Sequence, residues 1–296
     1  MNNNTHTAGR MADHFSLKRM MAYLRFYCRM EGRTLLYAVG TIFTIIAVII
    51  FISVITHLSV YRYGYEQLRQ MPGFDPMWSA ECNCAMFLLL LLAPVAGSMI
   101  YGRFSTKSSR IEVLTIPATG TEKLASWMII YIAGAFVAWF VCLMCVDILR
   151  VLLMHILTPY GSQVHVINPS RLLTFNEFVS TEGALRTTKW IVDIYGIALF
   201  LEALFAVGSI YLPRYSFVKT SCALMLLNSV IALLLIAGQH LFFGNSPVMS
   251  TLHELGPGEM TFSRIVWSGI IWVVVAGLLY WLSYARMKQT EVALKW

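Results

Sequence analysis

The sequence contains few charged residues, and this scarcity excludes an ordinary soluble domain. Only 12% of the 296 residues are charged and 58% are hydrophobic, whereas soluble domains carry roughly a quarter charged residues. The net charge of +7 could suit nucleic-acid binding, but the basic residues lie beside apolar runs, where they orient membrane helices. The composition therefore predicts a polytopic membrane protein.

Several catalytic motifs are also missing, and their absence argues against an enzyme. The chain has no G-x-x-x-x-G-K-[ST] loop, so we expect it not to bind ATP itself. It has no H-E-x-x-H pair and no paired glutamates within a helix. No histidine within a span accompanies Ser98 or Ser209, each of which follows a glycine. These absences disfavour the zinc, glutamate and serine classes of intramembrane protease.

The six cysteines form no evident disulfide or metal framework. Cys142 and Cys145 lie in an apolar run, where cysteine is usually a small packing residue. Cys82 and Cys84 flank a single residue, a spacing that bridges poorly, and no histidine lies near them to complete a zinc site. We therefore expect this chain to bind no metal and no cofactor.

Six apolar runs have the length of about twenty residues that a helix needs to cross a bilayer. The predicted fold class is an all-α membrane protein with six transmembrane helices and an N-terminal amphipathic interfacial helix. We expect the spans at about 35–56, 83–101, 124–146, 190–212, 217–237 and 264–284. Residues 1–14 are predicted to be a disordered tail, and residues 15–296 to form a single transmembrane domain.

The distribution of lysine and arginine predicts the orientation of these spans. If both termini are cytoplasmic, fifteen of the 22 basic residues lie in cytoplasmic segments, although the outer loops contain more residues. The positive-inside rule then places the termini, the loop Tyr101–Lys123 and the turn at Pro213 in the cytoplasm.

An amphipathic helix is predicted before the first span, with Ser16 as its N-cap and its end near Arg33. Its apolar stripe consists of Leu17, Met20, Met21, Leu24 and Cys28. Its basic residues, on another face, are Lys18, Arg25, Arg29 and Arg33. This pattern favours a helix lying in the membrane interface. The alternative is an ordinary cytoplasmic helix that leads into the first span.

The loop Tyr101–Lys123 is too highly charged to lie in hydrocarbon. Its middle, from about Ser108 to Thr115, can form two helical turns, which Pro117 then ends because proline lacks an amide hydrogen. Thr119 followed by Glu122 has the spacing of a capping box, which would start the next helix. We predict a small surface helix held between two spans.

Glu202 is the acidic residue near the middle of a span, where a carboxylate costs a few kcal/mol. One interpretation is that Glu202 lines a translocation path or a subunit interface. The other is that it makes a structural hydrogen bond to Asn228 or to a serine of another helix.

Two further features predict contacts between and along helices. Asp147 and Arg150 share a helix face and can pair as their helix leaves the membrane. Gly196, Ala203 and Gly208 are small residues of the fourth span that permit close approach of a neighbouring helix.

Three segments carry a resemblance to a known family. They are the amphipathic stretch FSLKRMMAYLRFYCRMEGR, the loop sequence EVLTIPATGTEKLASW with its Ile-Pro-Ala-Thr…Glu-Lys pattern, and the lysine-containing tail SYARMKQTEV. With the six spans, they resemble the membrane subunit of a type-2 ABC exporter, a bacterial permease with six helices per subunit. The architecture covers most of the chain, whereas the motifs cover a small part of it.

The resemblance implies partners and site residues. A separate ATPase subunit, which would bind ATP and Mg²⁺, would dock on the cytoplasmic loop, and two permease subunits, identical or different, would form the pathway. The coupling interface would comprise Lys107, Arg110, Ile111, Glu112 and Leu114. The connecting helix would carry Lys18, Arg25, Arg29 and Arg33. The implied location is the bacterial cytoplasmic membrane. The resemblance does not identify the transported substrate.

The sequence also fits two functions other than that of a permease. Glu202 could serve a proton-coupled secondary transporter, although the chain shows no internal repeat and only one deep ionisable residue. A non-transporting accessory membrane protein that anchors partners is the third possibility.

Overall fold

The computed structural model describes residues 15–63, 76–102, 108, 111, 115–158, 164–174, 184–212, 214–238 and 262–293. These residues are helical almost throughout and contain no strand. Six of the helices are long and apolar enough to cross a membrane. The predicted all-α class and the number of spans are confirmed, and the fold indicates a multi-pass membrane protein.

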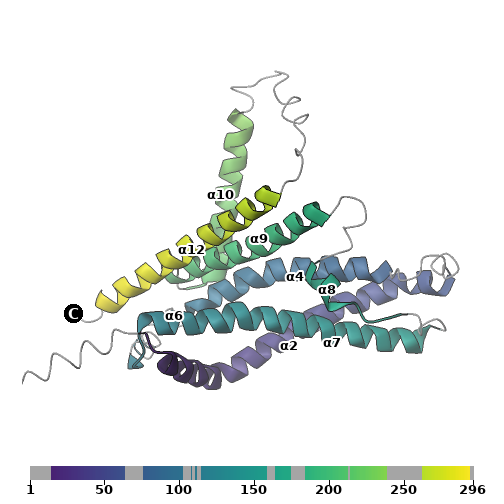
Figure 1. Ribbon diagram of the computed structural model, residues 1–296, viewed down its shortest axis with the longest axis horizontal. Helices are drawn as coiled ribbons and strands as arrows, with labels where there is room; N and C mark the ends of the chain where they lie inside the picture. The colour runs from purple at the N-terminus through teal and green to yellow at the C-terminus, as the bar shows by residue number, and fades with distance from the viewer. Residues whose placement is uncertain are drawn as a thin grey trace, which may run out of the picture.

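The helices run mostly along the long axis of the molecule, and one departs from it (Figure 1). In chain order they are α2 (Leu17–Tyr63), α4 (Pro76–Ile100), α6 (Gly120–Met128), the π-helical turn η2 (Ile129–Ala133), α7 (Gly134–Leu157), α8 (Pro169–Thr174), α9 (Ala184–Tyr211), α10 (Ser216–Gly238) and α12 (Phe262–Ala293). Helix α4 packs against α9, which packs against α12, while α2 lies along α7.

The first helix is longer than the sequence predicts. A helix ending near Arg33 and a separate span were expected, but α2 runs without a break from Leu17 to Tyr63. The expected break is wrong because these 47 residues contain no proline, and Gly32 alone does not end the helix. Figure 1 shows the first turns of α2 taking a different direction from its long remainder.

Other helices also extend beyond their predicted ends, including α9, which begins at Ala184, and α12, which ends at Ala293. Helix α4 begins at Pro76 rather than at residue 83, so the predicted loop from His57 to Cys82 is shorter at both ends. Helix α6, η2 and α7 together run from Gly120 to Leu157, whereas the predicted span covers 124–146. The charged residues that mark these ends in the sequence are buried and paired in the fold, as described below.

The buried side chains form two clusters along the bundle. The first joins the second half of α2 to the early part of α4 and the later part of α7, and includes Ile46, Met77, Leu88, Trp139, Leu143 and Met154. The second joins the start of α2 to the end of α4, the end of α6, the second half of α9 and α12, and includes Tyr27, Tyr101, Trp127, Ala206 and Met287. Each end of the molecule therefore has its own core.

Part of the connection between α7 and α9 belongs to the first core. Residues 155–189 lie between the predicted third and fourth spans, but Val164, Ile167 and Leu172 are at most 5% exposed. Segment 164–174 thus folds back onto the bundle, where α8 packs against α4 and α9.

Glycines of α9 and α4 allow close helix contacts, as predicted for α9. A Cβ on Gly196 would collide with Trp272 of α12, and one on Gly208 would collide with Thr220 of α10. A Cβ on Gly97 of α4 would overlap the backbone carbonyl of Glu202. Only glycine, which has no side chain, permits such an approach. Gly196 and Gly208 therefore set how closely α12 and α10 approach α9, and Gly97 sets how closely α4 approaches it.

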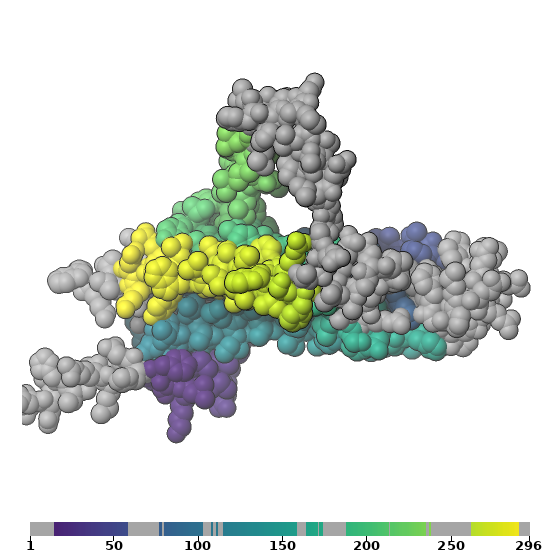
Figure 2. All heavy atoms as spheres, turned by 45° about the horizontal axis from the view of Figure 1, so that its top comes forward, coloured from purple at the N-terminus to yellow at the C-terminus, as the bar shows by residue number. Residues whose placement is uncertain are grey.

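Helix α10 leaves the bundle at a steep angle (Figures 1 and 2). Its first turns are anchored, because Thr220 is 6% exposed and the ring of Phe217 lies 5.4 Å from that of Phe205. Further along, apolar side chains such as Met225, Leu226 and Leu234 are more than half exposed. The outer part of α10 thus presents an apolar surface.

Candidate functional site

The loop between α4 and α6 is described at only a few of its positions before Thr115. Ser108, Ile111 and Thr115 are helical and exposed, and Ile111 is 56% exposed. The predicted surface helix from Ser108 to Thr115 agrees with the structure at these three positions. The other residues of the expected coupling interface lie outside the described residues, and they are Lys107, Arg110, Glu112 and Leu114.

The capping box predicted at the start of the next helix is confirmed. The Thr119 backbone is extended, and its hydroxyl accepts a hydrogen bond from the amide of Glu122 at 3.3 Å. In return, the Thr119 amide donates to Oε2 of Glu122 at 3.0 Å. Because these two bonds satisfy amides that the first turn leaves open, α6 begins at Gly120 and the chain direction is set there.

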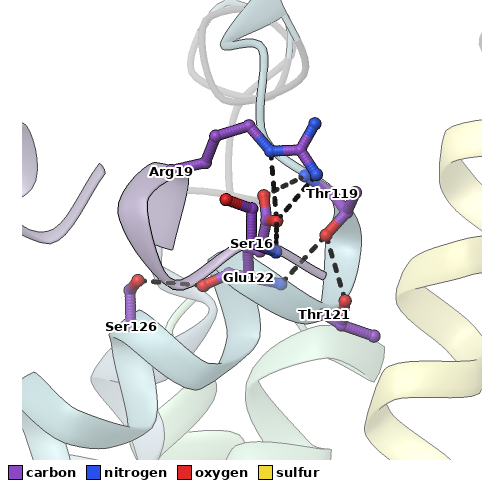
Figure 3. A network of polar contacts seen from close by, with 6 residues as sticks. All are labelled: Ser16, Arg19, Thr119, Thr121, Glu122 and Ser126. Atoms are coloured by element: carbon purple, nitrogen blue, oxygen red, sulfur yellow. Dashed lines mark hydrogen bonds and ion pairs between the residues drawn. The ribbon is translucent and has the colours of Figure 1, made fainter. Parts of the chain in front are cut away.

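The same glutamate also binds the start of α2 (Figure 3). The amide of Ser16 donates to Oε1 of Glu122 at 2.7 Å, and Nη2 of Arg19 lies 3.0 Å from that oxygen. The Glu122 side chain is 0% exposed, whereas that of Arg19 is 35% exposed. Donors from two segments that are over 100 residues apart therefore converge on one buried carboxylate. We call Ser16, Arg19, Thr119 and Glu122 the Glu122 clamp.

Aromatic side chains extend the Glu122 clamp into the second core. Rings of Tyr23 and Tyr101 contact that of Trp127, with centroids 6.4 and 5.9 Å away. The Tyr27 hydroxyl lies 3.0 Å from that of Tyr131, and Tyr101 shares a 3.0 Å hydrogen bond with Ser283 of α12. The start of α2, the end of α4, α6 and α12 are therefore joined at this end of the bundle.

The N-terminal part of α2 buries a different set of residues from the predicted apolar stripe. Met20 is buried, but Leu17, Met21 and Cys28 are exposed, and the bundle instead contacts Tyr23 and Tyr27. The four basic side chains of the predicted connecting helix are exposed: Lys18, Arg25, Arg29 and Arg33. They are thus exposed on the N-terminal part of α2.

A second ionic group lies in the first core. Nε of Arg150 is 2.6 Å from Oε1 of Glu81, and its Nη2 is 2.8 Å from Oδ1 of Asp147. The amide of Ile167 donates to Oδ2 of Asp147 at 2.7 Å, and Arg150 donates to the carbonyl of His165. All three charged side chains are at most 3% exposed. We call Glu81, Asp147 and Arg150 the Arg150 cluster.

The predicted pairing of Asp147 with Arg150 is therefore confirmed. The helix continues beyond the pair to Leu157, and both side chains are buried within the bundle. The participation of Glu81 was missed, because no local spacing connects residues 81 and 150. The signal for a further acidic partner is the number of guanidinium donors, because one aspartate leaves some donors of a buried arginine to be satisfied.

Glu202 and Asn228 are not brought together. Glu202 is 6% exposed and lines a cavity between α4, η2, α7 and α9, whereas Asn228 is exposed on α10. Among the residues that the structure describes, Oε1 of Glu202 has no hydrogen-bond partner. The hydrogen bond to Asn228, one form of the structural interpretation, is thus not formed. Whether Glu202 lines a translocation path or a subunit interface stays a prediction.

Asp193, on the same helix as Glu202, has several partners. It pairs with Lys189 at 2.6 Å and accepts hydrogen bonds from Ser268 and Trp272 of α12. It therefore joins α9 to α12 and differs from Glu202 in having its charge compensated.

Cysteines and potential metal ligands are dispersed. All six cysteines are free thiols. Within the described ranges, no three His, Cys, Asp or Glu side chains group in a way that could hold a metal ion.

Comparison with protein families, with curated proteins and with solved structures finds no match for this chain. The fold by itself defines a helical protein with six apolar helices long enough to cross a membrane. The function must therefore be inferred from the arrangement of its residues.

Proposed function

We propose that this chain is the membrane-spanning permease subunit of an ATP-driven, ABC-type exporter. ATP and Mg²⁺ bind a separate ATPase subunit, which docks on the loop between α4 and α6. The observation that carries this proposal is the Glu122 clamp, which fixes the start of α2 to the start of α6 beside an exposed helical segment.

The Glu122 clamp supports a mechanical connection. Thr119 lies four residues after the exposed Thr115, so displacement of the loop helix acts directly on the capped start of α6. Because Ser16 and Arg19 share the Glu122 carboxylate, the first turns of α2 move with α6. A helix of two turns is unstable alone, and we therefore expect an ATPase subunit to brace it through Ile111 and Leu114.

The distribution of charge supports docking on the cytoplasmic side of the membrane. The exposed residues Lys18, Arg25, Arg29 and Arg33 lie on the N-terminal part of α2, whose start is bound to the start of α6 by Glu122. Basic segments stay on the cytoplasmic side, so both termini and the loop are cytoplasmic in this proposal. The chain then resides in the bacterial cytoplasmic membrane.

The exposed apolar surface of α10 is an argument for contact with a second subunit. A helix that is exposed over its outer turns gains van der Waals contacts when another transmembrane helix packs on it. We place the second permease subunit, an identical or a related chain, against the outer part of α10, where Met225, Leu226 and Leu234 are exposed.

Two steps test the proposal. First, the tagged chain is purified from its native membrane, and we expect an ATPase with a G-x-x-x-x-G-K-[ST] loop to copurify. Second, the Ile111→Ala, Leu114→Ala double variant should bind this ATPase more weakly by about 2–4 kcal/mol, the scale of central interface residues. Ile156→Ala is the matched control, because Ile156 is 81% exposed near the end of α7.

The outcomes separate the possible functions. Wild-type affinity in the double variant would refute the assignment of the coupling helix. Failure of any ATPase to copurify would refute the exporter proposal and favour an accessory membrane protein.

A second candidate is a proton-coupled secondary transporter, which the buried carboxyl of Glu202 favours. A carboxyl within a span is a common element of proton relays. Transport driven by an imposed pH gradient in vesicles that contain only this chain, and lost in Glu202→Gln, would establish this function in place of the first.

A further inference from the structure

A cavity of about 380 Å³, open on one side, lies along the spanning part of the bundle. Helix α4 forms one side, η2 with the start of α7 forms a second, and α9 forms a third. Its lining includes Leu89, Ala96, Tyr131, Phe136, Tyr195 and Glu202. This volume falls in the range of about 300–1,000 Å³ that is usual for small-molecule sites.

Glu202 supplies a polar group without a partner to this cavity. It is 6% exposed, and in the described part of the chain its Oε1 receives no hydrogen bond. The close approach of Gly97 to the Glu202 backbone fixes the position of this residue between α4 and α9. Because a buried carboxyl group that lacks full compensation is costly, a ligand that pairs with the Glu202 carboxylate would offset that cost.

Aromatic rings form the other distinctive part of the lining. The rings of Phe136 and Tyr195 lie 6.2 Å apart at 60°, which connects α7 to α9. The hydroxyls of the two tyrosines already have partners, because Tyr195 donates to the carbonyl of Leu173 and Tyr131 bonds with Tyr27. Glu202 is therefore the polar group that the lining offers to a ligand, while aromatic faces attract organic cations.

The wall formed by η2 is an independent indication. Residues Ile129–Ala133 form a π-helical turn between α6 and α7, and Tyr131, Ile132 and Ala133 of this turn line the cavity. Such turns are rare and occur frequently at functional sites.

We propose that this cavity binds a lipophilic primary or secondary ammonium compound. Its N–H donates to the carboxylate of Glu202, and its apolar body contacts Leu89, Ala96 and the rings of Tyr131, Phe136 and Tyr195. That this ammonium compound is the exported substrate rests on the proposed function, whereas its binding does not.

Charge and geometry select this class of ligand. A buried carboxylate is best compensated by a cation that also donates a hydrogen bond, and a quaternary ammonium lacks that hydrogen. A metal ion fits poorly, because Ca²⁺ takes six to eight oxygen ligands and the lining offers one carboxylate and two engaged hydroxyls.

The test uses two fluorescent probes that share a dansyl group and a five-carbon chain and differ in the terminal ammonium. Dansylcadaverine carries a terminal primary ammonium, and N-pentyl dansylamide ends in a methyl group. Binding to the purified chain in lipid nanodiscs is measured by dansyl fluorescence, with empty nanodiscs correcting for partition into lipid. We expect dansylcadaverine to bind at least about tenfold more tightly, and this preference to disappear in Glu202→Gln.

Asp193→Asn is the matched control, because it removes a carboxylate of the same helix outside the cavity and should keep the preference. Equal affinities for the two probes in the wild type, binding of neither probe, or an unchanged preference in Glu202→Gln would each overturn the proposal.

A second measurement on the wild type does not depend on the folding of a variant. Dicyclohexylcarbodiimide reacts with carboxyl groups in apolar surroundings, and mass spectrometry locates the product. We expect dansylcadaverine to protect Glu202 from this reagent, and N-pentyl dansylamide to protect it less. Equal protection would overturn the proposal. Because no ATPase is present, failure here leaves the docking test of the exporter proposal unaffected.

Discussion

The two ends of the bundle use buried carboxylates in different ways. In the Glu122 clamp, the carboxylate accepts hydrogen bonds from the amides of Ser16 and Thr119 and pairs with the partly exposed Arg19. In the Arg150 cluster, two carboxylates share one arginine that is 0% exposed, and Asp147 also accepts a hydrogen bond from the amide of Ile167. The first group combines backbone donors with a partly exposed cation, whereas the second relies on a fully buried cation.

This difference predicts different mechanical properties. Removing one member of a fully buried ionic group leaves uncompensated charge and costs about 3–5 kcal/mol. The Glu122 clamp can lose Arg19 and still keep two amide donors, so its end of the bundle can be rearranged at lower cost. We therefore expect the end with the Arg150 cluster to stay rigid while the end with the Glu122 clamp moves.

The largest effect is expected for Arg150→Met, which leaves Glu81 and Asp147 without their cation. The free energy of unfolding should fall by about 3–5 kcal/mol. A thiol-reactive dye during heating in detergent reports this, because Cys82, Cys84 and Cys142 are buried.

Arg214→Met is the control for this variant, since Arg214 is exposed. The triple variant Glu81→Gln, Asp147→Asn, Arg150→Met removes all three charges and should recover part of the loss. Equal stability of Arg150→Met and the wild type would contradict the role of the cluster.

An intermediate effect is expected for Glu122→Gln. The substitution keeps a similar shape but replaces charge-assisted hydrogen bonds to Ser16 and Arg19 by neutral ones, at a cost of about 1.5–3 kcal/mol. Hydrogen exchange should accelerate in the first turns of α2, around Met20 and Tyr23, and much less near Ile46. Faster exchange throughout the bundle would show that Glu122 supports the whole fold rather than its own end.

The smallest effect is expected for Arg19→Ala, because this side chain is 35% exposed. Partly exposed ion pairs contribute up to about 1 kcal/mol, and salt reduces that contribution. The difference in melting temperature from the wild type should be small and should shrink as salt is raised. A loss as large as that of Glu122→Gln would mean that the arginine, and not the amides, holds the clamp together.

The sequence predicts features that depend on near neighbours in the chain. The six spans follow from runs of apolar residues, and the capping box follows from the three-residue separation of Thr119 and Glu122. Asp147 and Arg150 are likewise three residues apart, which places both on one helix face. Hydropathy and helical spacing act over one or a few turns, so they can be read directly from the chain.

Only the tertiary structure decides which distant groups meet. Glu122 binds Ser16, 106 residues away, and Arg150 reaches Glu81 on another helix. Hydropathy places the predicted end of the third span at 146, before Asp147, because it counts a charge as a cost, whereas the folded bundle compensates Asp147 and Arg150 and α7 continues to Leu157. The cavity at Glu202 likewise arises from how α4, η2, α7 and α9 pack, since helix packing depends on side chains that no local pattern brings together.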